Sequence, residues 1–276
     1  MTIDRIEAHR LFFAKLIAAN AGIAPGSEIE AALASTPREQ FVGPPPWRIF
    51  TRSGYVESPD DPALLYQDVV VSLGGEGPFN NGQPTLHAIC LAALDLKKGE
   101  RVVHVGAGTG YYTTLLAKLV GETGAVDAYE VEPEFARRAT SNLAEFPYVT
   151  VHSRSGAEGP LPACDVLYVN AGATEPLDVW LDALRPKGRL LFPMTPDGGA
   201  GAMLLITKQE DGMFAARFLL QAQFVPCIGA RDEATAQKLS EAFRNSGWTK
   251  VKSLRRGNAP DESCWFAGDG WWLSTQ

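Results

Sequence analysis

From residue 101 onward, short apolar runs alternate with stretches of helical periodicity. The apolar runs predict strands, and the periodic stretches predict helices. The predicted strands are residues 101–105, 125–129, 149–152, 165–170 and 189–193, and the predicted helices are residues 111–120, 133–145 and 177–184. This order is typical of an α/β protein with a Rossmann-like, doubly wound and mainly parallel sheet. Residues 202–207 and 213–223 flank Asp211-Gly212 and predict a hairpin that adds antiparallel strands.

The first hundred residues are patterned as helices and loops. Residues 4–19 predict a helix, because Phe13 and Ile17 fall on one stripe. A second, short helix begins at a capping box, in which Ser27 and Glu30 can exchange backbone hydrogen bonds. Turn-forming residues predict irregular loops over residues 43–62 and 74–84, and a helix follows over residues 85–94.

The last part of the chain is rich in aromatic residues. Residues 232–244 predict a helix, and residues 264–274 predict two short strands about a Gly-Asp-Gly turn. Four of the six tryptophans lie in this part, at Trp248, Trp265, Trp271 and Trp272. Packing of their rings on the main domain is the favoured interpretation, and an aromatic lid or partner surface is the alternative. We predict an N-terminal helical and loop region (residues 1–94), an α/β core (95–230) and a small C-terminal α/β extension (231–276).

Composition and charge narrow the class of protein. Hydrophobic residues make up 45% of the 276 positions, which excludes a fully disordered chain. The net charge of −7, from 25 basic and 32 acidic residues, disfavours a nucleic acid partner bound over a broad basic face. The longest uncharged apolar stretch, residues 88–94, is too short to cross a membrane, and the charged N-terminal residues form no signal segment. Four cysteines without zinc or disulfide spacing favour a cytoplasmic protein.

The most informative segment is a glycine loop between a predicted strand and a predicted helix. Gly106, Gly108 and Gly110 allow a tight turn there and let a ligand approach the backbone near the helix N-terminus. A dinucleotide fingerprint would need glycine where Tyr111 stands, so the spacing favours S-adenosylmethionine as the cofactor. Glu130 follows the next strand, where a carboxylate can accept hydrogen bonds from two ribose hydroxyls. The alternative is an ordinary turn followed by a surface glutamate.

Further segments extend this pattern on both sides of the glycine loop. They are Pro37-Arg38 with Phe41-Val42, Tyr66-Gln67-Asp68, residues 82–88 (GQPTLHA), residues 165–173 (DVLYVNAGA), residues 192–194 (FPM) and residues 224–226 (FVP). In this order and spacing the chain resembles the protein-L-isoaspartate O-methyltransferases over about residues 36–230. The resemblance implies a class I methyltransferase fold. It also implies methyl transfer from S-adenosylmethionine to the carboxylate of isoaspartyl residues in damaged proteins, a repair reaction.

The resemblance implies roles for individual residues. Cofactor binding is assigned to Gly106, Gly108, Gly110, Tyr111, Glu130 and Ser155, substrate binding to Asp68 and His87, and the catalytic loop to Asn80, Asn81 and Gly82. Three positions depart from the family pattern. Gly82 stands in place of a serine near the reacting carboxylate, and His104 replaces an acid before the glycine loop. Ser155 replaces the acid of a Gly-Asp-Gly segment that lies near the adenine.

Methylation of a carboxylate asks little of acid–base catalysis. The acceptor is already ionised at neutral pH, since carboxyl pKa values lie near about 4, so the enzyme mainly aligns oxygen, methyl and sulfur. The backbone N–H of Gly82, or the amides of Asn80 and Asn81, can take over from the missing serine hydroxyl. We expect His87 to pack inside the protein and His104 to be neutral and hydrogen-bonded.

Two other functions stay open at this point. The substrate can be a different carboxylate, in a peptide, a protein or a small molecule, because a departure falls in the substrate loop. The chain can also be a non-catalytic homologue that holds the cofactor, which His104 and Ser155 would favour. A dinucleotide oxidoreductase is disfavoured by Tyr111, and we find no metal-ligand spacing.

Overall fold

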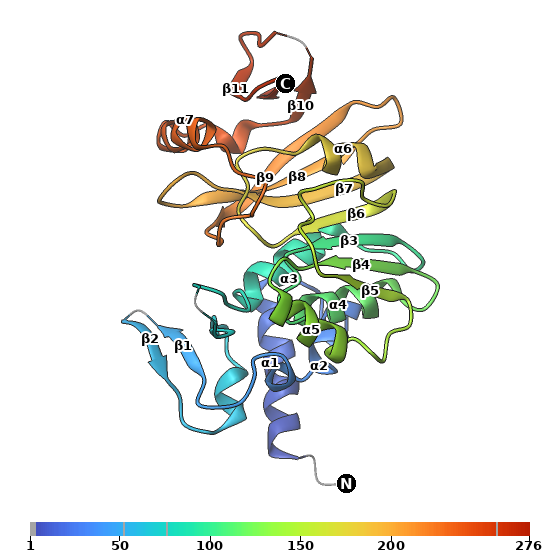
Figure 1. Ribbon diagram of the computed structural model, residues 1–276, viewed down its shortest axis with the longest axis vertical. Coiled ribbons are helices and arrows are strands. Elements are labelled where there is room, and N and C mark those ends of the chain that lie inside the picture. The colour runs from blue at the N-terminus through green and yellow to red at the C-terminus, as the bar shows by residue number, and fades with distance from the viewer. Residues whose placement is uncertain (1–3, 52, 76, 258) are drawn as a thin grey trace. The chain divides into compact units, whose positions relative to one another are not determined.

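The computed structural model describes residues 4–51, 53–75, 77–257 and 259–276. The chain divides into two compact units. Figure 1 labels the helices and strands that make them up. Unit 1 comprises residues 1–99, 107–126 and 132–153, and unit 2 comprises residues 100–106, 127–131 and 154–276. The three segments expected from the sequence stay a prediction.

Unit 2 is built on a mixed sheet. Its strands lie in the order β11-β12-β10-β9-β8-β7-β6-β3, and the last residues of β4 follow β3. The bounds are β3 (Arg101–Val105), β4 (Ala125–Tyr129), β6 (Cys164–Val169), β7 (Leu184–Met194), β8 (Gly201–Lys208), β9 (Phe214–Ala222), β10 (Ser253–Arg256), β11 (Cys264–Ala267) and β12 (Trp271–Ser274). Strands β3, β6 and β7 pair in parallel, and β7, β8 and β9 pair antiparallel. This arrangement confirms the predicted α/β fold class with its antiparallel hairpin.

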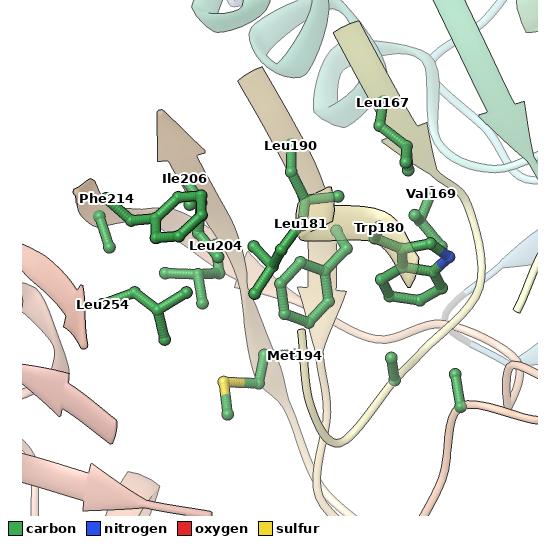
Figure 2. Close-up of a cluster of buried hydrophobic side chains, with 14 of the residues drawn as sticks. Leu167, Val169, Trp180, Leu181, Leu190, Met194, Leu204, Ile206, Phe214 and Leu254 are labelled. Carbon is green, nitrogen blue, oxygen red and sulfur yellow. The ribbon is translucent and has the colours of Figure 1, made fainter. Parts of the chain in front are cut away.

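One hydrophobic cluster of unit 2 lies on one face of this sheet. Trp180 and Leu181 from helix α6 (Asp178–Ala183) lie against side chains of the neighbouring strands, including Leu190 and Leu204 (Figure 2). All four side chains are buried, and each contributes roughly 1.5–3 kcal/mol by leaving water. The Trp180 indole N–H donates to the carbonyl of Gly156 at 2.8 Å, so its one polar atom is satisfied inside the core.

The aromatic tail joins the edge of the same sheet. Strand β10 pairs antiparallel with β9, with Leu254 opposite Phe214, and β12 pairs with β10. The sequence pattern missed β10, although it predicted β11, β12 and helix α7 (Glu233–Arg244). The rings of Trp248 and Trp265 pack edge-on against Phe218, at centroid distances of 5.7 and 5.4 Å. These contacts confirm the packing interpretation of the tail.

Unit 1 carries most of the helices. They are α1 (Arg5–Asn20), α2 (Glu28–Ala34), α3 (Pro84–Leu94), α4 (Tyr111–Val120) and α5 (Pro133–Asn142), with short 3-10 turns at Arg38–Gln40 and Pro62–Leu65. Helix α5 ends three residues before the predicted boundary. Strand β5 (Val149–His152) lies next to the first residues of β4, where the Val126 N–H donates to the Tyr148 carbonyl at 3.0 Å.

Half of the predicted capping box forms at α2. The Glu30 N–H donates to Ser27 Oγ at 3.2 Å, as the sequence predicts. The Glu30 carboxylate, however, accepts from the Gly26 N–H at 2.9 Å rather than from Ser27. The helix N-terminus is therefore capped, with the reciprocal bond moved by one residue.

The prediction of an irregular loop over residues 43–62 is wrong for residues 48–51 and 54–57. Strands β1 (Arg48–Thr51) and β2 (Gly54–Glu57) form an antiparallel hairpin there. Ile49 of this hairpin packs in a hydrophobic cluster with Val71 and Leu65, which gives the two four-residue strands a buried face. The prediction failed because the turn-forming residues of this segment do not indicate such packing. Residues 52 and 76, which fall in the two predicted loops, lie outside the described residues. Within the described part of the chain, no helix is both long and apolar enough to cross a bilayer.

Candidate cofactor and substrate sites

The glycine loop begins in unit 2, where β3 ends. Gly106 has a φ of +75° and donates its N–H to the carbonyl of Tyr129, the last residue of β4, at 2.9 Å. A Cβ at this position would lie 3.3 Å from the backbone carbon of Asn170, just after β6. Glycine thus suits both the left-handed backbone and the close approach of three strand ends.

The remaining glycines lie in unit 1 and lead into α4. Gly108 and Gly110 also have positive φ values, and Gly110 is the N-cap of the helix. A Cβ on Gly110 would lie 3.1 Å from Leu143 Cδ1, so α5 packs tightly against this turn. The next residue, Tyr111, is buried, and its ring packs edge-on against Phe41 with centroids 5.4 Å apart. The turn before α4 is therefore closely packed, and Tyr111 is part of the core.

Glu130 follows β4 directly in unit 2. Its exposed fraction is 6%, which excludes the alternative of a surface glutamate. A buried carboxylate is costly unless donors surround it, so this position is suited to accept hydrogen bonds from hydroxyl groups. Because Gly106 is bonded to the preceding residue Tyr129, the start of the glycine loop and Glu130 lie at adjacent strand ends.

Ser155 lies in the same unit, but its hydroxyl is already engaged. Its Oγ donates to the Ile228 carbonyl at 3.1 Å and accepts the Ala157 N–H at 3.1 Å. A Cβ on the next residue, Gly156, would lie 2.6 Å from Val105 Cγ2 and 3.1 Å from the Cβ of Tyr129. The serine thus ties its loop to residue 228, while the glycine lets the loop lie directly on the ends of β3 and β4.

His104 is buried on β3, as predicted for a neutral, hydrogen-bonded histidine. Its Nε2 lies 2.8 Å from Nδ2 of Asn170. Burial lowers the pKa of His104 to about 3, so the imidazole is neutral at physiological pH. The structure confirms this prediction.

In unit 1, Asp68 holds the start of α3. One carboxylate oxygen accepts the backbone N–H of Thr85 at 2.8 Å, and the other accepts Gln83 Nε2 at 3.1 Å. A carboxylate at this helix end also interacts favourably with the helix dipole. Asp68 therefore fixes the position of the predicted substrate loop relative to the helix that follows it.

The predicted catalytic loop is held by its own amides. The Gly82 N–H donates to Asn80 Oδ1 at 2.9 Å, and Asn80 Nδ2 donates to the Pro78 carbonyl at 3.1 Å. Asn81 exchanges hydrogen bonds with Val71, through its own N–H at 3.0 Å and through its Oδ1 at 2.8 Å. The Gly82 N–H and the Asn80 side-chain amide, two of the donors expected to replace a serine hydroxyl, are thus engaged in fixing the loop.

His87 lies directly against Gly82. Gly82 has a φ of +69°, and a Cβ there would lie 2.8 Å from His87 Cδ2 and closer still to Nε2. The imidazole stacks on the Tyr112 ring, with centroids 3.6 Å apart and an interplanar angle of 17°. Its exposed fraction is 2%, which confirms that His87 is packed. The structure thus brings together Gly82 and His87, whose contact the sequence did not predict.

Sequence reasoning also missed the environment of Arg38. The side chain is completely buried, Nη2 donates to the Val69 carbonyl at 3.2 Å, and the guanidinium lies over the rings of Phe13 and Tyr111. These ring distances, 5.1 and 5.5 Å, fit cation–π interactions. The Pro37-Arg38 segment is part of the family resemblance and was the signal that could have pointed to Arg38.

Comparison with known proteins settles the family. The family model for protein-L-isoaspartate(D-aspartate) O-methyltransferase (PCMT) matches residues 12–232. The chain belongs to the PCMT family. It is 30% identical to the protein-L-isoaspartate O-methyltransferase of Ignicoccus hospitalis over 206 residues, which cover 73% of this chain and 89% of the relative. The corresponding enzyme of Aeropyrum pernix is 33% identical over 219 residues, 75% of each chain.

Solved structures support the same fold. A protein-L-isoaspartate O-methyltransferase structure aligns with a TM-score of 0.68 and 22% identity, over 92% of this chain and 74% of that one. A beta-aspartate methyltransferase (PCMT) from Plasmodium falciparum, in complex with S-adenosyl-L-homocysteine, aligns with a TM-score of 0.63 and 18% identity. It covers 80% of this chain and 98% of that one. Family membership confirms the predicted enzyme class, an S-adenosylmethionine-dependent methyltransferase.

Proposed function

We propose that this PCMT family member transfers a methyl group from S-adenosylmethionine to the carboxylate of an isoaspartyl residue in a peptide or protein. The observation that carries the proposal is the family match over residues 12–232, which spans the glycine loop and the loop of residues 80–82. The four free cysteines of the described chain are compatible with a reducing compartment, and we infer that the enzyme acts in the cytoplasm.

We assign cofactor binding to the glycine loop and Glu130. The backbone of Gly106, Gly108 and Gly110 can approach a ligand without side-chain hindrance, and buried Glu130 can accept the ribose hydroxyls. Ser155 and Tyr111 would act by shaping the loops around the cofactor. The Ser155 hydroxyl is already hydrogen-bonded within the protein, and the Tyr111 ring is packed against Phe41. When bound, the cofactor supplies an electrophilic methyl group on a sulfonium.

On the substrate side, we assign the protein's role to positioning. The acceptor carboxylate needs no general base, so the requirement is to hold one oxygen in line with the methyl group. Asp68, Asn80 and Asn81 fix the backbone of the loop through the hydrogen bonds described above. Gly82 would then present the backbone that the carboxylate meets, with the buried His87 imidazole packed directly behind it.

Two measurements test this proposal. Calorimetric titration with S-adenosylhomocysteine should show binding. Absence of binding would indicate a protein that keeps the fold but does not hold the cofactor. Steady-state methyl transfer is then compared between an isoaspartyl peptide and small dicarboxylates at equal concentration. Higher kcat/KM on the peptide supports the proposal, whereas transfer to the small carboxylates alone would indicate a redirected enzyme.

A further inference from the structure

The β1–β2 hairpin is continuous, through backbone pairing, with the loop assigned to the substrate. Ile49 of β1 forms an antiparallel bridge with Val71, and Ser72 forms another with Asn80. The Phe50 N–H donates to the Val70 carbonyl at 2.8 Å, and the Ser72 N–H donates to the Arg48 carbonyl at 2.9 Å. Four short segments of unit 1 therefore lie side by side, in the order β2, β1, residues 70–72 and residues 79–81.

The register of these pairs determines which residues share a face. Paired residues point to the same side of a sheet, and neighbours along a strand point to opposite sides. Ile49 and Val71 are buried, so their face lies against the hydrophobic cluster. The opposite face is the outer face, formed by Arg48, Phe50, Tyr55, Glu57, Val70, Ser72 and Asn80.

The outer face is apolar and exposed at its hairpin end. Phe50 has an exposed fraction of 51%, and its ring packs edge-on against Tyr55 with centroids 5.2 Å apart. The Arg48 guanidinium lies over the Tyr55 ring, 5.2 Å from the ring centroid. Cross-strand contacts thus hold the aromatic pair in place while one ring faces solvent, an arrangement typical of recognition surfaces.

We propose that the outer face binds an extended segment of the polypeptide substrate, flanking the carboxylate that is methylated. The inference rests on the proposed function, because it takes the loop of residues 80–82 as the place of the reacting carboxylate. The backbone pairing makes Asn80 and Phe50 parts of one continuous face, which favours a polypeptide over a small molecule. A small carboxylate would reach the loop but not the hairpin.

The strand spacing predicts where the flanking side chain lies. Asn80 lies opposite Ser72, which lies opposite Arg48. Phe50 is therefore two strand spacings across and two residues along from Asn80. With about 4.8 Å per spacing and about 3.3 Å per residue, the separation is about 12 Å. An extended peptide spans this distance with three to four residues, so we expect a preference for an aliphatic or aromatic side chain three or four residues from the isoaspartate.

The test uses the full chain and fluorescent isoaspartyl peptides with leucine or serine at both the third and the fourth residue from the isoaspartate, on either side. Peptide dissociation constants are measured by anisotropy with S-adenosylhomocysteine present, and kcat/KM is measured separately. In one of the two directions, the leucine peptide should bind about tenfold more tightly than its serine counterpart, about 1.4 kcal/mol. Phe50→Ala should remove most of this difference, and Phe50→Leu should retain it.

The matched control is Phe12→Ala, which removes an exposed ring (exposed fraction 65%) on α1, an element that contributes no residue to the outer face. Equal binding of leucine and serine peptides by the unaltered protein would overturn the inference. So would equal losses in the Phe50 and Phe12 variants, or failure of every peptide to bind. Selective binding without methyl transfer would support the outer face and count against the proposed function alone.

Discussion

Replacing Gly82 by alanine tests the packing of the substrate loop on His87. Two costs add in this variant. A non-glycine residue at a φ of +69° costs about 1–2 kcal/mol. The new Cβ would also lie 2.8 Å from His87 Cδ2, and overpacking of this kind costs about 1–3 kcal/mol. The free energy of unfolding should therefore fall by about 2–5 kcal/mol, a large part of an ordinary domain's stability.

A second glycine separates the two costs. Gly22 has nearly the same φ, +68°, but a Cβ there meets nothing within 4 Å. Gly22→Ala should therefore lose only the backbone contribution, about 1–2 kcal/mol. Urea unfolding followed by circular dichroism measures both variants under identical conditions.

The steric contribution should disappear when His87 is shortened. In the double variant Gly82→Ala/His87→Ala, the loss should be smaller than the sum of the two single losses by about 1–3 kcal/mol. Two results would contradict a steric contact between residue 82 and His87. One is a loss of unfolding free energy in Gly82→Ala no larger than that in Gly22→Ala. The other is a loss in the double variant equal to the sum of the two single losses.

Three further outcomes follow from buried groups. The folded pKa of His104, about 3, lies below the ordinary 6.5, so the unfolded state takes up the proton first as pH falls. His104 should therefore lower the free energy of unfolding by about 1.4 kcal/mol per pH unit between about pH 6 and pH 3. His104→Asn should lose this contribution, and exposed His9→Asn should keep it. Glu130→Gln should weaken calorimetric S-adenosylhomocysteine binding about 10- to 100-fold, whereas exposed Glu122→Gln should not. Gly156→Ala, crowded by Val105, should weaken that binding and lower the urea midpoint, and unchanged values would contradict the packing of its loop.

Elements with strong local signals were predictable from the sequence. Strand β3 and helix α4 begin and end at the predicted residues, because an apolar run, a glycine turn and Gly121 mark their limits. The β1–β2 hairpin was missed because its four-residue strands depend on burial of Ile49 against Val71, which is distant in sequence. Strand β10 was missed for a similar reason, since it exists by pairing with β9.

The geometry of the candidate sites was likewise predictable from the sequence only in part. The positions of the glycine turn and of Glu130 followed from sequence spacing, because strand ends place consecutive βα loops on one edge of a sheet. The partner of the Ser155 hydroxyl could not be predicted, since Ile228 is 73 residues away. Nor could the contact between Gly82 and His87, because it depends on where a helical side chain points across a loop.

The central claim is that this chain methylates the carboxylate of isoaspartyl residues. Radiolabelled methyl transfer from S-adenosylmethionine to an isoaspartyl peptide, beside the aspartyl peptide of the same sequence, tests it most directly. Label should be incorporated into the isoaspartyl peptide as a base-labile methyl ester, with the aspartyl peptide at background. Equal labelling of the two peptides, or label in neither while S-adenosylhomocysteine binds, would contradict the account.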